Sequence, residues 1–418
     1  MLKPQLKQKA LEAGFDLAGV APLDVWKDLD FARKWVEQGF GGEMRYLENP
    51  KRQDPRLVLP SAQSVVCVGL IYNAPYAYST ETADISLSSG TKATHGPSGE
   101  TAVSRAWISR YAWGQDYHEI MRAKLEKLRG AIESLAPGVE TRVYVDTGPV
   151  VERAFARYSG IGWTGKNTCL INPTKGSWFF LGVVLTSLLL EPDLPAPDRC
   201  GTCTRCLEAC PTGALTRPYV MDASRCIAYL NIEMKGSIPE QYRSQIGLNL
   251  FGCDICQDVC PWNRSQETGV RSQNKTTSFW PSADGLQAQD KGFGRTGAAT
   301  TTLQEFQPME ITISSSSDIS DTESSGEAEP PPARRFSLFN PPLDMLTEVT
   351  EEDFRRAFAQ SSIKRPKYKG WLRNLCVVMG NSHDRRFIPK LEELSHHEDP
   401  VIREHAEWAL WRLKQKPE

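Results

Sequence analysis

The residues best suited to chemistry in this sequence are its cysteines. Eight of the eleven cysteines lie between Cys200 and Cys260. The first four, with the proline after them, have the spacing Cys-x2-Cys-x2-Cys-x3-Cys-Pro, which is that of bacterial ferredoxins. In a reducing compartment, a dense and regularly spaced group of cysteines indicates metal ligands before it indicates disulfides. The sequence therefore predicts an iron–sulfur domain in this stretch.

A second run of cysteines completes two sets of four ligands. It has the spacing Cys-x2-Cys-x3-Cys-Pro and lacks one cysteine, which Cys226 supplies from between the runs. In two-cluster ferredoxins, the last cysteine of a run ligates the other cluster. A pair of tetrahedral zinc sites is the alternative, and the repeated spacing disfavours it. We therefore expect two [4Fe–4S] clusters, the first held by Cys200, Cys203, Cys206 and Cys260, and the second by Cys210, Cys226, Cys253 and Cys256.

Two neighbouring clusters imply one-electron transfer, so the protein is either a passive electron carrier or an enzyme whose remaining domains hold an electron acceptor. The other three cysteines, Cys67, Cys169 and Cys376, lie in apolar segments and are expected to pack in the core.

A glycine-rich stretch, Gly160–Asn167, resembles the phosphate-binding loop G-x-x-x-x-G-K-[ST] without matching it. Asn167 stands where a hydroxyl should bind magnesium, and the preceding segment VERAFARYSG predicts a helix, whereas that loop follows a strand. We therefore expect close backbone approach to a ligand, or a helix-ending turn, in place of nucleotide hydrolysis.

Composition places these motifs in a soluble globular protein. The chain has 418 residues, a net charge of −2, 40% hydrophobic and 24% charged residues, which suggests two or three domains. The longest apolar run, 178–190, is shorter than the about twenty residues of a membrane-spanning helix. The N-terminal segment has helical spacing and no continuous apolar region, so we expect no secretion signal and a cytosolic location.

Alternating helix and strand patterns predict an α/β domain over residues 1–195. Its expected helices and strands occupy 1–13, 15–22, 26–40, 65–73, 116–135, 141–146, a helix after Pro149, and 178–190, with a long loop over 77–101.

Three further regions follow. Residues 196–265 form the cysteine-rich domain. Residues 266–335 are rich in Ser, Thr, Gln, Gly and Pro, with seven acids and no Lys or Arg between 296 and 333, so we expect a disordered insertion in which 268–333 is dispensable. Helical periodicity returns in 336–418, with a break at Asp399-Pro400, and predicts a small all-α helical-repeat module.

These motifs together resemble those of the epoxyqueuosine reductases, cobalamin-dependent tRNA-modifying enzymes related to corrinoid reductive dehalogenases. The resemblance rests on RQDPRLVLPSAQSVV (52–66), ISRYAWGQDYH (108–118), VDTGPVVERAFARYSGIGWTGKNT (145–168), CIAYLNIE (226–233), KGWLRNLCVVMGN (369–381) and the two cysteine runs. It covers nearly all of the chain except 80–103 and 265–335. A reductive dehalogenase and a ferredoxin-type electron carrier are the alternative functions, since both have a similar cluster domain.

The resemblance implies a fold and cofactors. It implies a nitroreductase-like α/β domain, a ferredoxin-like domain and a HEAT-like helical module, with base-off cobalamin held between the first two. Cobalamin, reduced by the clusters, would convert the epoxide of epoxyqueuosine in a tRNA anticodon loop to queuosine. An external electron donor and a monomeric chain are also expected. The candidate residues for the cobalamin pocket are Arg56, Arg110, Asp146, Lys166, Asn167 and Tyr229.

No histidine ligand to cobalt is expected. The corrinoid-binding pattern Asp-x-His-x-x-Gly begins at Asp116 but has Met121 in place of its glycine. His118 is therefore interpreted as a partly exposed helix residue.

Asp146 is the candidate general acid. It follows the apolar strand RVYV and precedes Thr147-Gly148-Pro149, at an edge of the sheet where ligand crevices open in open α/β folds. An epoxide opened by reduction needs a proton, and burial would raise the pKa of this carboxyl above its usual value of about 4. Capping of the following helix is the alternative role on these residues alone. The resemblance favours the proton donor.

Basic residues gather in the C-terminal module. Between Arg355 and Lys390 there are ten Lys or Arg and one acid, Asp384, a concentration expected for phosphate contacts, although a solvated helix face is the alternative. We expect tRNA contacts from Lys364, Arg365, Lys367, Lys369 and Arg373.

Overall fold

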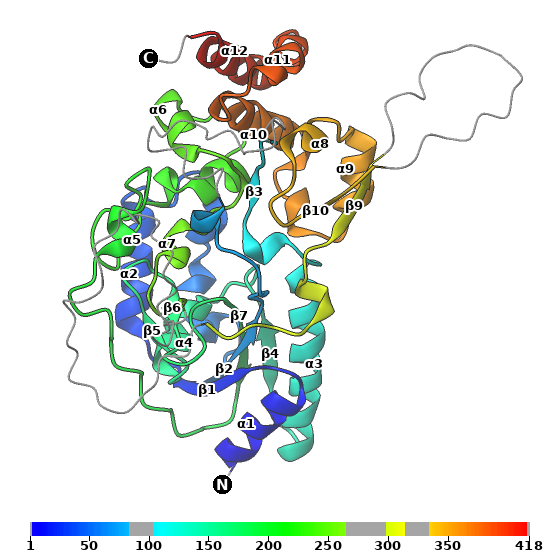
Figure 1. Cartoon of the computed structure of the whole chain (residues 1–418). Coiled ribbons are helices and arrows are strands. Elements are labelled where there is room, and N and C mark those ends of the chain that lie inside the picture. Colours follow the sequence, from blue (N-terminus) through cyan, green and yellow to red (C-terminus); the bar gives the residue numbers. More distant parts are fainter. Residues whose placement is uncertain (1, 83–102, 265–297, 314–333, 416–418) are drawn as a thin grey trace, which may run out of the picture.

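The computed structural model describes residues 2–82, 103–264, 298–313 and 334–415. Near the N-terminus lies a four-stranded sheet in the order β1 (Leu17–Pro22), β2 (Ser64–Ile71), β7 (Phe179–Thr186) and β4 (Thr141–Tyr144) (Figure 1). Every neighbouring pair is antiparallel. The rule that crevices open at the carboxyl ends of parallel strands therefore does not apply to this sheet, although Asp146 does border a cavity after β4, as expected.

Helices cover both faces of this sheet because its two central strands are apolar on both sides, with β2 buried throughout. On one face, α1 (Leu2–Glu12) and α3 (Tyr117–Leu135) pack with Val66, Val68 and Val184. On the other face, α4 (Glu152–Tyr158) packs Ala154 and Phe155 against Cys67 and Val183. The predicted helix–sheet layering and its strand positions in 1–195 are confirmed.

The cysteine runs carry two short helices, α5 (Arg205–Glu208) and α7 (Ile255–Asp258), which pack together. The intervening chain forms a π-helical turn, η8 (Tyr229–Glu233), the four-residue helix α6 (Glu240–Arg243) and β8 (Asn249–Phe251). Strand β8 pairs in parallel with β3 (Trp107–Ile108), which comes from the N-terminal half. The α/β part and the cysteine-rich part are thus joined by a strand pair.

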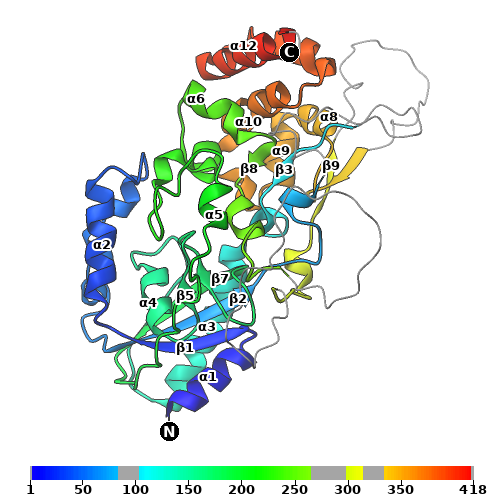
Figure 2. The ribbon, with the colours of Figure 1, turned by 60° about the vertical axis from the view of Figure 1, so that its left-hand side comes forward.

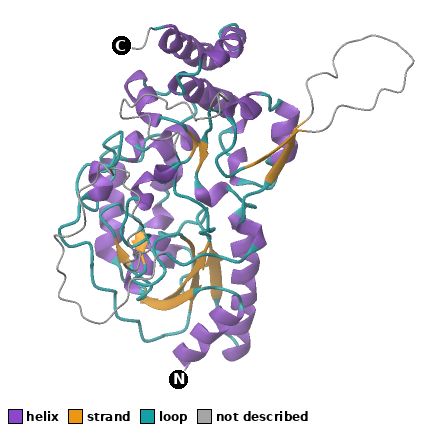
Figure 3. Cartoon of the chain, viewed as in Figure 1, coloured by secondary structure: helices purple, strands orange, loops and turns teal. Residues whose placement is uncertain are grey.

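The C-terminal helices are α8 (Leu343–Thr347), α9 (Glu351–Ala357), α10 (Lys367–Asn381), α11 (Ile388–Leu394) and α12 (Pro400–Lys414). The predicted break is confirmed, since α12 begins at Pro400 and Asp399 caps it by accepting a hydrogen bond from Val401 N at 2.9 Å. Figure 3 shows that helices dominate this end of the molecule.

The C-terminal helices are not a separate body, because one hydrophobic core joins them to the cysteine-rich part. That core contains Trp371 of α10, Leu230 of η8 and Phe251 of β8. Helix α10 is buried almost throughout. The helices therefore hold the cysteine-rich part in place as well as forming a surface of their own.

The expectation of disorder across 266–335 is wrong for 298–313. Phe306 is 3% exposed and packs in the core beside the sheet, and Thr301 N donates to Asn73 O at 2.7 Å. Strand β9 (Glu310–Ile313) pairs antiparallel with β10 (Arg334–Ser337). Composition missed this short segment because its few apolar residues are averaged with polar neighbours. Replacement of all of 268–333 would remove these core residues, which argues against the expectation that the segment is dispensable.

Most of the predicted loop over 77–101, and residues 265–297 and 314–333, lie outside the described residues. Within the described ranges, no helix is both long and apolar enough to cross a membrane. Helix α2 (Trp26–Glu37) stands away from the sheet, as Figure 2 shows. Its side chains form one wall of the cavity described next.

Candidate active site

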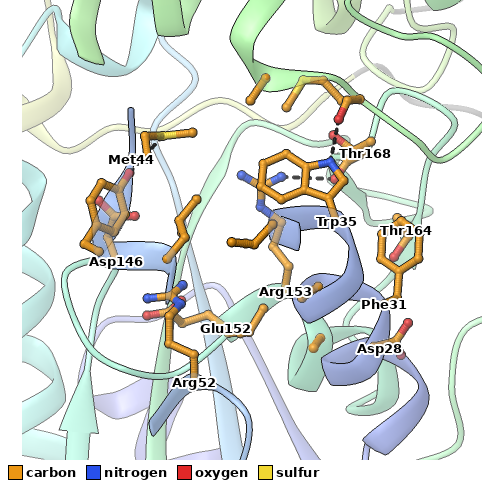
Figure 4. Close-up of a pocket in the computed structure, with 18 of the residues that line it drawn as sticks. Asp28, Phe31, Trp35, Met44, Arg52, Asp146, Glu152, Arg153, Thr164 and Thr168 are labelled. Atoms are coloured by element: carbon orange, nitrogen blue, oxygen red, sulfur yellow. Dashed lines mark hydrogen bonds between the residues drawn. The ribbon is translucent and has the colours of Figure 1, made fainter. Parts of the chain in front are cut away.

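A cavity of about 1300 Å³ lies where the α/β part, the cysteine-rich part and the C-terminal helices meet. Phe31 and Trp35 of α2 give it an apolar wall, which Figure 4 shows opposite Asp146 and Glu152. Ligand pockets typically measure about 300–1,000 Å³, so this cavity suits a large ligand. Side chains from all three parts border it, including Asp146, Glu152, Cys226, Tyr229, Lys364 and Arg365.

Asp146 lies in a tight turn after β4. Its backbone has φ 49°, which is uncommon for any residue except glycine. Two residues on, Gly148 packs so closely on the ring of Tyr144 that a Cβ would clash with it. Arg52 Nη1 donates to Gly148 O at 2.9 Å and holds the turn. The turn therefore places the carboxylate in the cavity at some cost in backbone strain.

Asp146 does not cap the following helix. Helix α4 begins at Glu152, its N-cap is Val151, and no side chain accepts a capping hydrogen bond there. The carboxylate instead accepts a hydrogen bond from Tyr117 Oη at 2.7 Å, and its Oδ2 lies 3.3 Å from His118 Nε2. The capping alternative is therefore excluded by the contacts that the side chain makes.

The first turn of α3 positions these partners. Asp116 caps α3 by accepting from His118 N at 3.2 Å. The same carboxylate lies 2.7 Å from His118 Nδ1 and 3.0 Å from Lys364 Nζ. One continuous chain of contacts thus runs from Lys364 through Asp116 and His118 to Asp146 and Tyr117.

These contacts set the protonation states. Desolvation by burial raises the pKa of Asp146, but hydrogen bonds from His118 and Tyr117 outweigh it and lower the pKa to about 2. Desolvation lowers the pKa of His118, whereas its bonds to Asp116 and Asp146 raise the pKa to about 9. The expected rise in the pKa of Asp146 is therefore wrong in this arrangement. Near neutral pH the pair is an imidazolium and a carboxylate.

The cysteines fall into two neighbourhoods. Burial and the nearby Cys203 and Cys200 raise the pKa of Cys206. Burial and the nearby Cys200 and Cys206 raise the pKa of Cys260 in the same way. Burial and the charge of Cys210 raise the pKa of Cys226, and burial with Cys226 and Cys210 does so for Cys253. The hydrogen bond with Cys169, burial, and the charges of Cys253 and Cys226 raise the pKa of Cys256, which lies in this second neighbourhood.

These neighbours are compatible with the two predicted sets of four, which stay a prediction, and they also place Cys169 beside Cys256. All eleven cysteines are free thiols, and within the described ranges no three His, Cys, Asp or Glu side chains are placed to hold a single metal ion. Cys226 borders the cavity, so the second set lies on the cavity side.

Four of the six candidate pocket residues lie elsewhere. Lys166 Nζ donates to Gly201 O at 2.6 Å and Cys203 O at 2.9 Å, and Asn167 Nδ2 donates to Cys256 O at 3.1 Å. Lys166 and Asn167 therefore hold the cysteine-rich loops in place, and this is the role of the stretch that resembles a phosphate loop. That stretch does follow a helix, α4, as expected.

The two arginines are structural. Arg110 is 1% exposed and donates to the carbonyl oxygens of Ala74, Tyr76 and Ala77. Arg56 pairs with Asp24 at 2.9 Å. Neither borders the cavity, so their assignment to the pocket is wrong. Tyr229 does border it, and its Oη accepts from Glu43 N at 2.8 Å.

The candidate tRNA contacts divide between the surface and the core. Lys364, Arg365, Lys367 and Lys369 are exposed, and the first two border the cavity. Arg373 is 1% exposed and donates to the carbonyl oxygens of Leu230, Met234 and Gly236. The prediction that Arg373 contacts tRNA is therefore wrong, because its side chain holds η8 to α10.

Sequence reasoning missed three cavity residues. Tyr117 and Glu152 lie within the quoted stretches 108–118 and 145–168, but neither is singled out there. His118 is a partly exposed residue of α3, as expected, but its contact with Asp146 is not predicted. The adjacency of Asp116, Tyr117 and His118 at a helix start was the available signal, since it places three polar side chains in one turn.

Comparison with known proteins agrees with this geometry. The family described as "4Fe-4S double cluster binding domain" matches residues 199–263, and the family described as "Epoxyqueuosine reductase QueG, DUF1730" matches residues 52–147. The epoxyqueuosine reductase of Xanthomonas campestris is 34% identical over 97% of this chain and 94% of its own length. The chain belongs to the epoxyqueuosine reductase family. The Escherichia coli member is 31% identical over 98% of this chain and 89% of its own.

Solved members of the epoxyqueuosine reductase family share the whole fold. One, crystallised with an epoxyqueuosine-modified tRNA-Tyr stem loop, is 29% identical, with a TM-score of 0.73 over 99% of this chain and 90% of that chain. Another, from Bacillus subtilis, has its catalytic aspartate loop swung out of the active site and is 28% identical, with a TM-score of 0.72 over 99% and 91%.

Proposed function

We propose that this chain reduces epoxyqueuosine to queuosine at the wobble position of a tRNA anticodon loop, the last step of queuosine biosynthesis. One observation carries the proposal: a single cavity is bordered by the Asp146–His118 pair, by Cys226 of the iron–sulfur part and by two cations of the C-terminal part. The cavity thus has a proton source, a neighbouring iron–sulfur ligand and cations that can bind phosphate on its walls. Relatives that match nearly the whole chain are epoxyqueuosine reductases.

The reaction has a defined balance. Removal of the epoxide oxygen to give the alkene takes two electrons and two protons, and the oxygen leaves as water. The site must therefore receive electrons one at a time from iron–sulfur clusters and must hold at least one transferable proton beside the substrate.

The cavity suits cobalamin. Its volume of about 1300 Å³ and its apolar wall fit a large, flat-faced ligand. His118 is the only histidine bordering the cavity in the described part of the chain, and both of its ring nitrogens are occupied by Asp116 and Asp146. We therefore propose base-off cobalamin without a histidine ligand, held near Trp35, Tyr229 and Glu152. When bound, cobalamin supplies the reduced cobalt centre that the epoxide requires.

His118 and Asp146 supply the proton. His118 Nε2 holds it 3.3 Å from Asp146 Oδ2, because the raised pKa of about 9 keeps the imidazole charged near neutral pH. As the epoxide oxygen gains charge, Asp146 acts as general acid by passing to it the proton that it takes from His118 Nε2. Tyr117 Oη, at 2.7 Å, orients the carboxylate.

The clusters would deliver electrons in order. Cys210, Cys226, Cys253 and Cys256 hold the cluster next to the cavity, and Cys200, Cys203, Cys206 and Cys260 hold the outer one. An external donor would reduce the outer cluster first. Cys226, which borders the cavity, supports this order.

The C-terminal part would bind tRNA. Lys364 and Arg365 border the cavity, and Lys367 and Lys369 are exposed in the first turn of α10. All four can neutralise phosphates. In this proposal, residues 1–195 form a nitroreductase-like cobalamin domain, 196–265 a ferredoxin-like domain and 336–418 a HEAT-like module, and one chain acts as a monomer.

Cofactor dependence tests the proposal. Anaerobically purified protein with intact clusters should bind about one cobalamin per chain and should convert epoxyqueuosine tRNA only when cobalamin and a low-potential reductant are both present. Full conversion without any corrinoid in the protein or the buffer would contradict it.

A further inference from the structure

Glu152 is a buried acid that the proposed mechanism does not use. It is the first residue of α4 and is 9% exposed. It borders the cavity, and its Oε1 is buried without a hydrogen-bond partner among the described residues. A buried polar atom left unpaired is destabilising, because it has lost its hydrogen bonds to water without gaining others. Such an atom at a cavity wall therefore indicates a ligand group that completes it.

We propose that Glu152 is a neutral carboxylic acid that donates a hydrogen bond to a carbonyl oxygen of a corrin amide side chain. The inference rests on the proposed cobalamin cofactor. Corrin amides offer many carbonyl acceptors around the rim of a ring whose faces are apolar, and a buried neutral acid offers one O–H donor with little solvation to lose. Glu152 would thus fix the orientation of the corrin within the cavity.

The charges around Glu152 explain its protonation. Desolvation by burial and the negative charge of Asp146 raise the pKa of Glu152 to about 7, although Arg52 and Arg153 oppose the rise. Arg52 is already engaged with Gly148 O, and Arg153 with Thr168 O at 3.2 Å. On the sheet side, burial keeps the Cys67 thiol neutral by raising its pKa. Figure 4 shows the carboxyl end of Glu152 on the side of Arg52.

The proposal predicts the sign of a pH effect. The acid is protonated below about pH 7 and ionised above it. Since only the protonated acid donates, cobalamin affinity should be highest at low pH and should fall by about tenfold between pH 6 and pH 8. A carboxylate acting as acceptor would give the opposite sign.

Cobalamin binding, measured without turnover, tests this. Cob(II)alamin is titrated anaerobically into cluster-loaded protein at pH 6, 7 and 8, and the dissociation constant is read from visible absorbance. In Glu152→Gln, the amide keeps a donor and cannot ionise, so affinity should match the wild type at pH 6 and stay constant to pH 8. Glu152→Ala should bind about tenfold more weakly than the wild type at pH 6 and should also show no pH dependence.

Glu191→Gln is the matched control, because Glu191 is exposed and lies outside the cavity wall; it should keep the wild-type pH dependence. The proposal is overturned if Glu152→Gln keeps that dependence, if it binds as weakly as Glu152→Ala, or if Glu152→Ala binds like the wild type. A flat wild-type profile overturns it even if no variant folds. Failure of the wild type to bind cob(II)alamin at any pH would instead remove the cofactor proposal itself.

Discussion

The carboxylate of Asp146 lies 3.3 Å from His118 Nε2. Asp146 itself stands in a turn, where its backbone has a positive φ. This pair joins the loop after a strand to the first turn of a helix. Its charge state is set by both partners, because the pKa of Asp146 falls to about 2 and that of His118 rises to about 9. The pair therefore stores one proton in the pH range of cells.

Replacement of His118 should change the pH dependence of turnover. In the wild type, turnover should fall as the pH rises through about 9, where the raised pKa of His118 predicts loss of the stored proton. His118→Gln cannot store a proton, so turnover should drop by about 10²-fold or more and lose that alkaline limb. Rates measured from pH 6 to 10 check this. A variant with the same alkaline limb would show that another group titrates.

Asp146→Asn should separate chemistry from folding. Asparagine tolerates the positive φ and can still bond to Tyr117, so the unfolding midpoint and cluster content should stay close to the wild type. Turnover should fall by about 10²- to 10⁴-fold because the proton donor is lost. Comparison of the thermal midpoint with the single-turnover rate makes the distinction. Wild-type turnover in this variant would exclude Asp146 as the general acid.

Cys226→Ala should remove one cluster and leave the other. Wild-type protein should carry about eight irons per chain, and the variant about four. Because Cys226 borders the cavity, the lost cluster should be the one that reduces cobalamin, and the variant should still accept an electron in its outer cluster. Iron analysis and electron paramagnetic resonance after reduction check both points. Full iron loading, or zinc in the wild type, would contradict the ligand sets.

Basic residues of the C-terminal part offer a matched pair of variants. Neutral substitutions at Lys364, Arg365, Lys367 and Lys369 together should weaken tRNA binding and flatten its salt dependence. Arg373→Met should leave the salt slope unchanged and should destabilise the fold by about 3 kcal/mol or more, because one buried and two partly buried carbonyl oxygens lose their donor. Binding at several salt concentrations and urea unfolding measure the two effects.

The ordered segment 298–313 gives a stability prediction. Phe306 is 3% exposed in the core beside the sheet, so Phe306→Ala should lower the free energy of unfolding by about 3–5 kcal/mol. Thr302→Ala, at a less buried position of the same segment, is the control and should change it little. Equal stability of both variants would show that the segment does not support the core.

Local sequence patterns predicted the positions of individual helices, strands and cysteine ligands. Apolar runs located β2 and β7, and the cysteine spacing predicted two sets of four ligands, which stay a prediction. The antiparallel sheet order and the pairing of β3 with β8 depend on contacts far apart in the chain, so no local pattern revealed them.

Site prediction failed where charge was taken as a sign of exposure. Arg110 and Arg373 occupy motif positions because each satisfies several backbone carbonyl oxygens in the core. The sequence predicted Asp146 as a site residue. Its pKa, however, depends on contacts with His118 and Tyr117 that only the fold reveals.

Analysis of the product nucleoside tests the central claim most directly. Anaerobic protein with both clusters and cobalamin is incubated with reductant and an epoxyqueuosine-modified tRNA stem loop, and the digested nucleosides are separated by mass spectrometry. The account predicts conversion of epoxyqueuosine to queuosine, with loss of one oxygen atom, in the wild type and near absence of that product in Asp146→Asn. Unchanged epoxyqueuosine in the wild type, or equal conversion by both proteins, would contradict it.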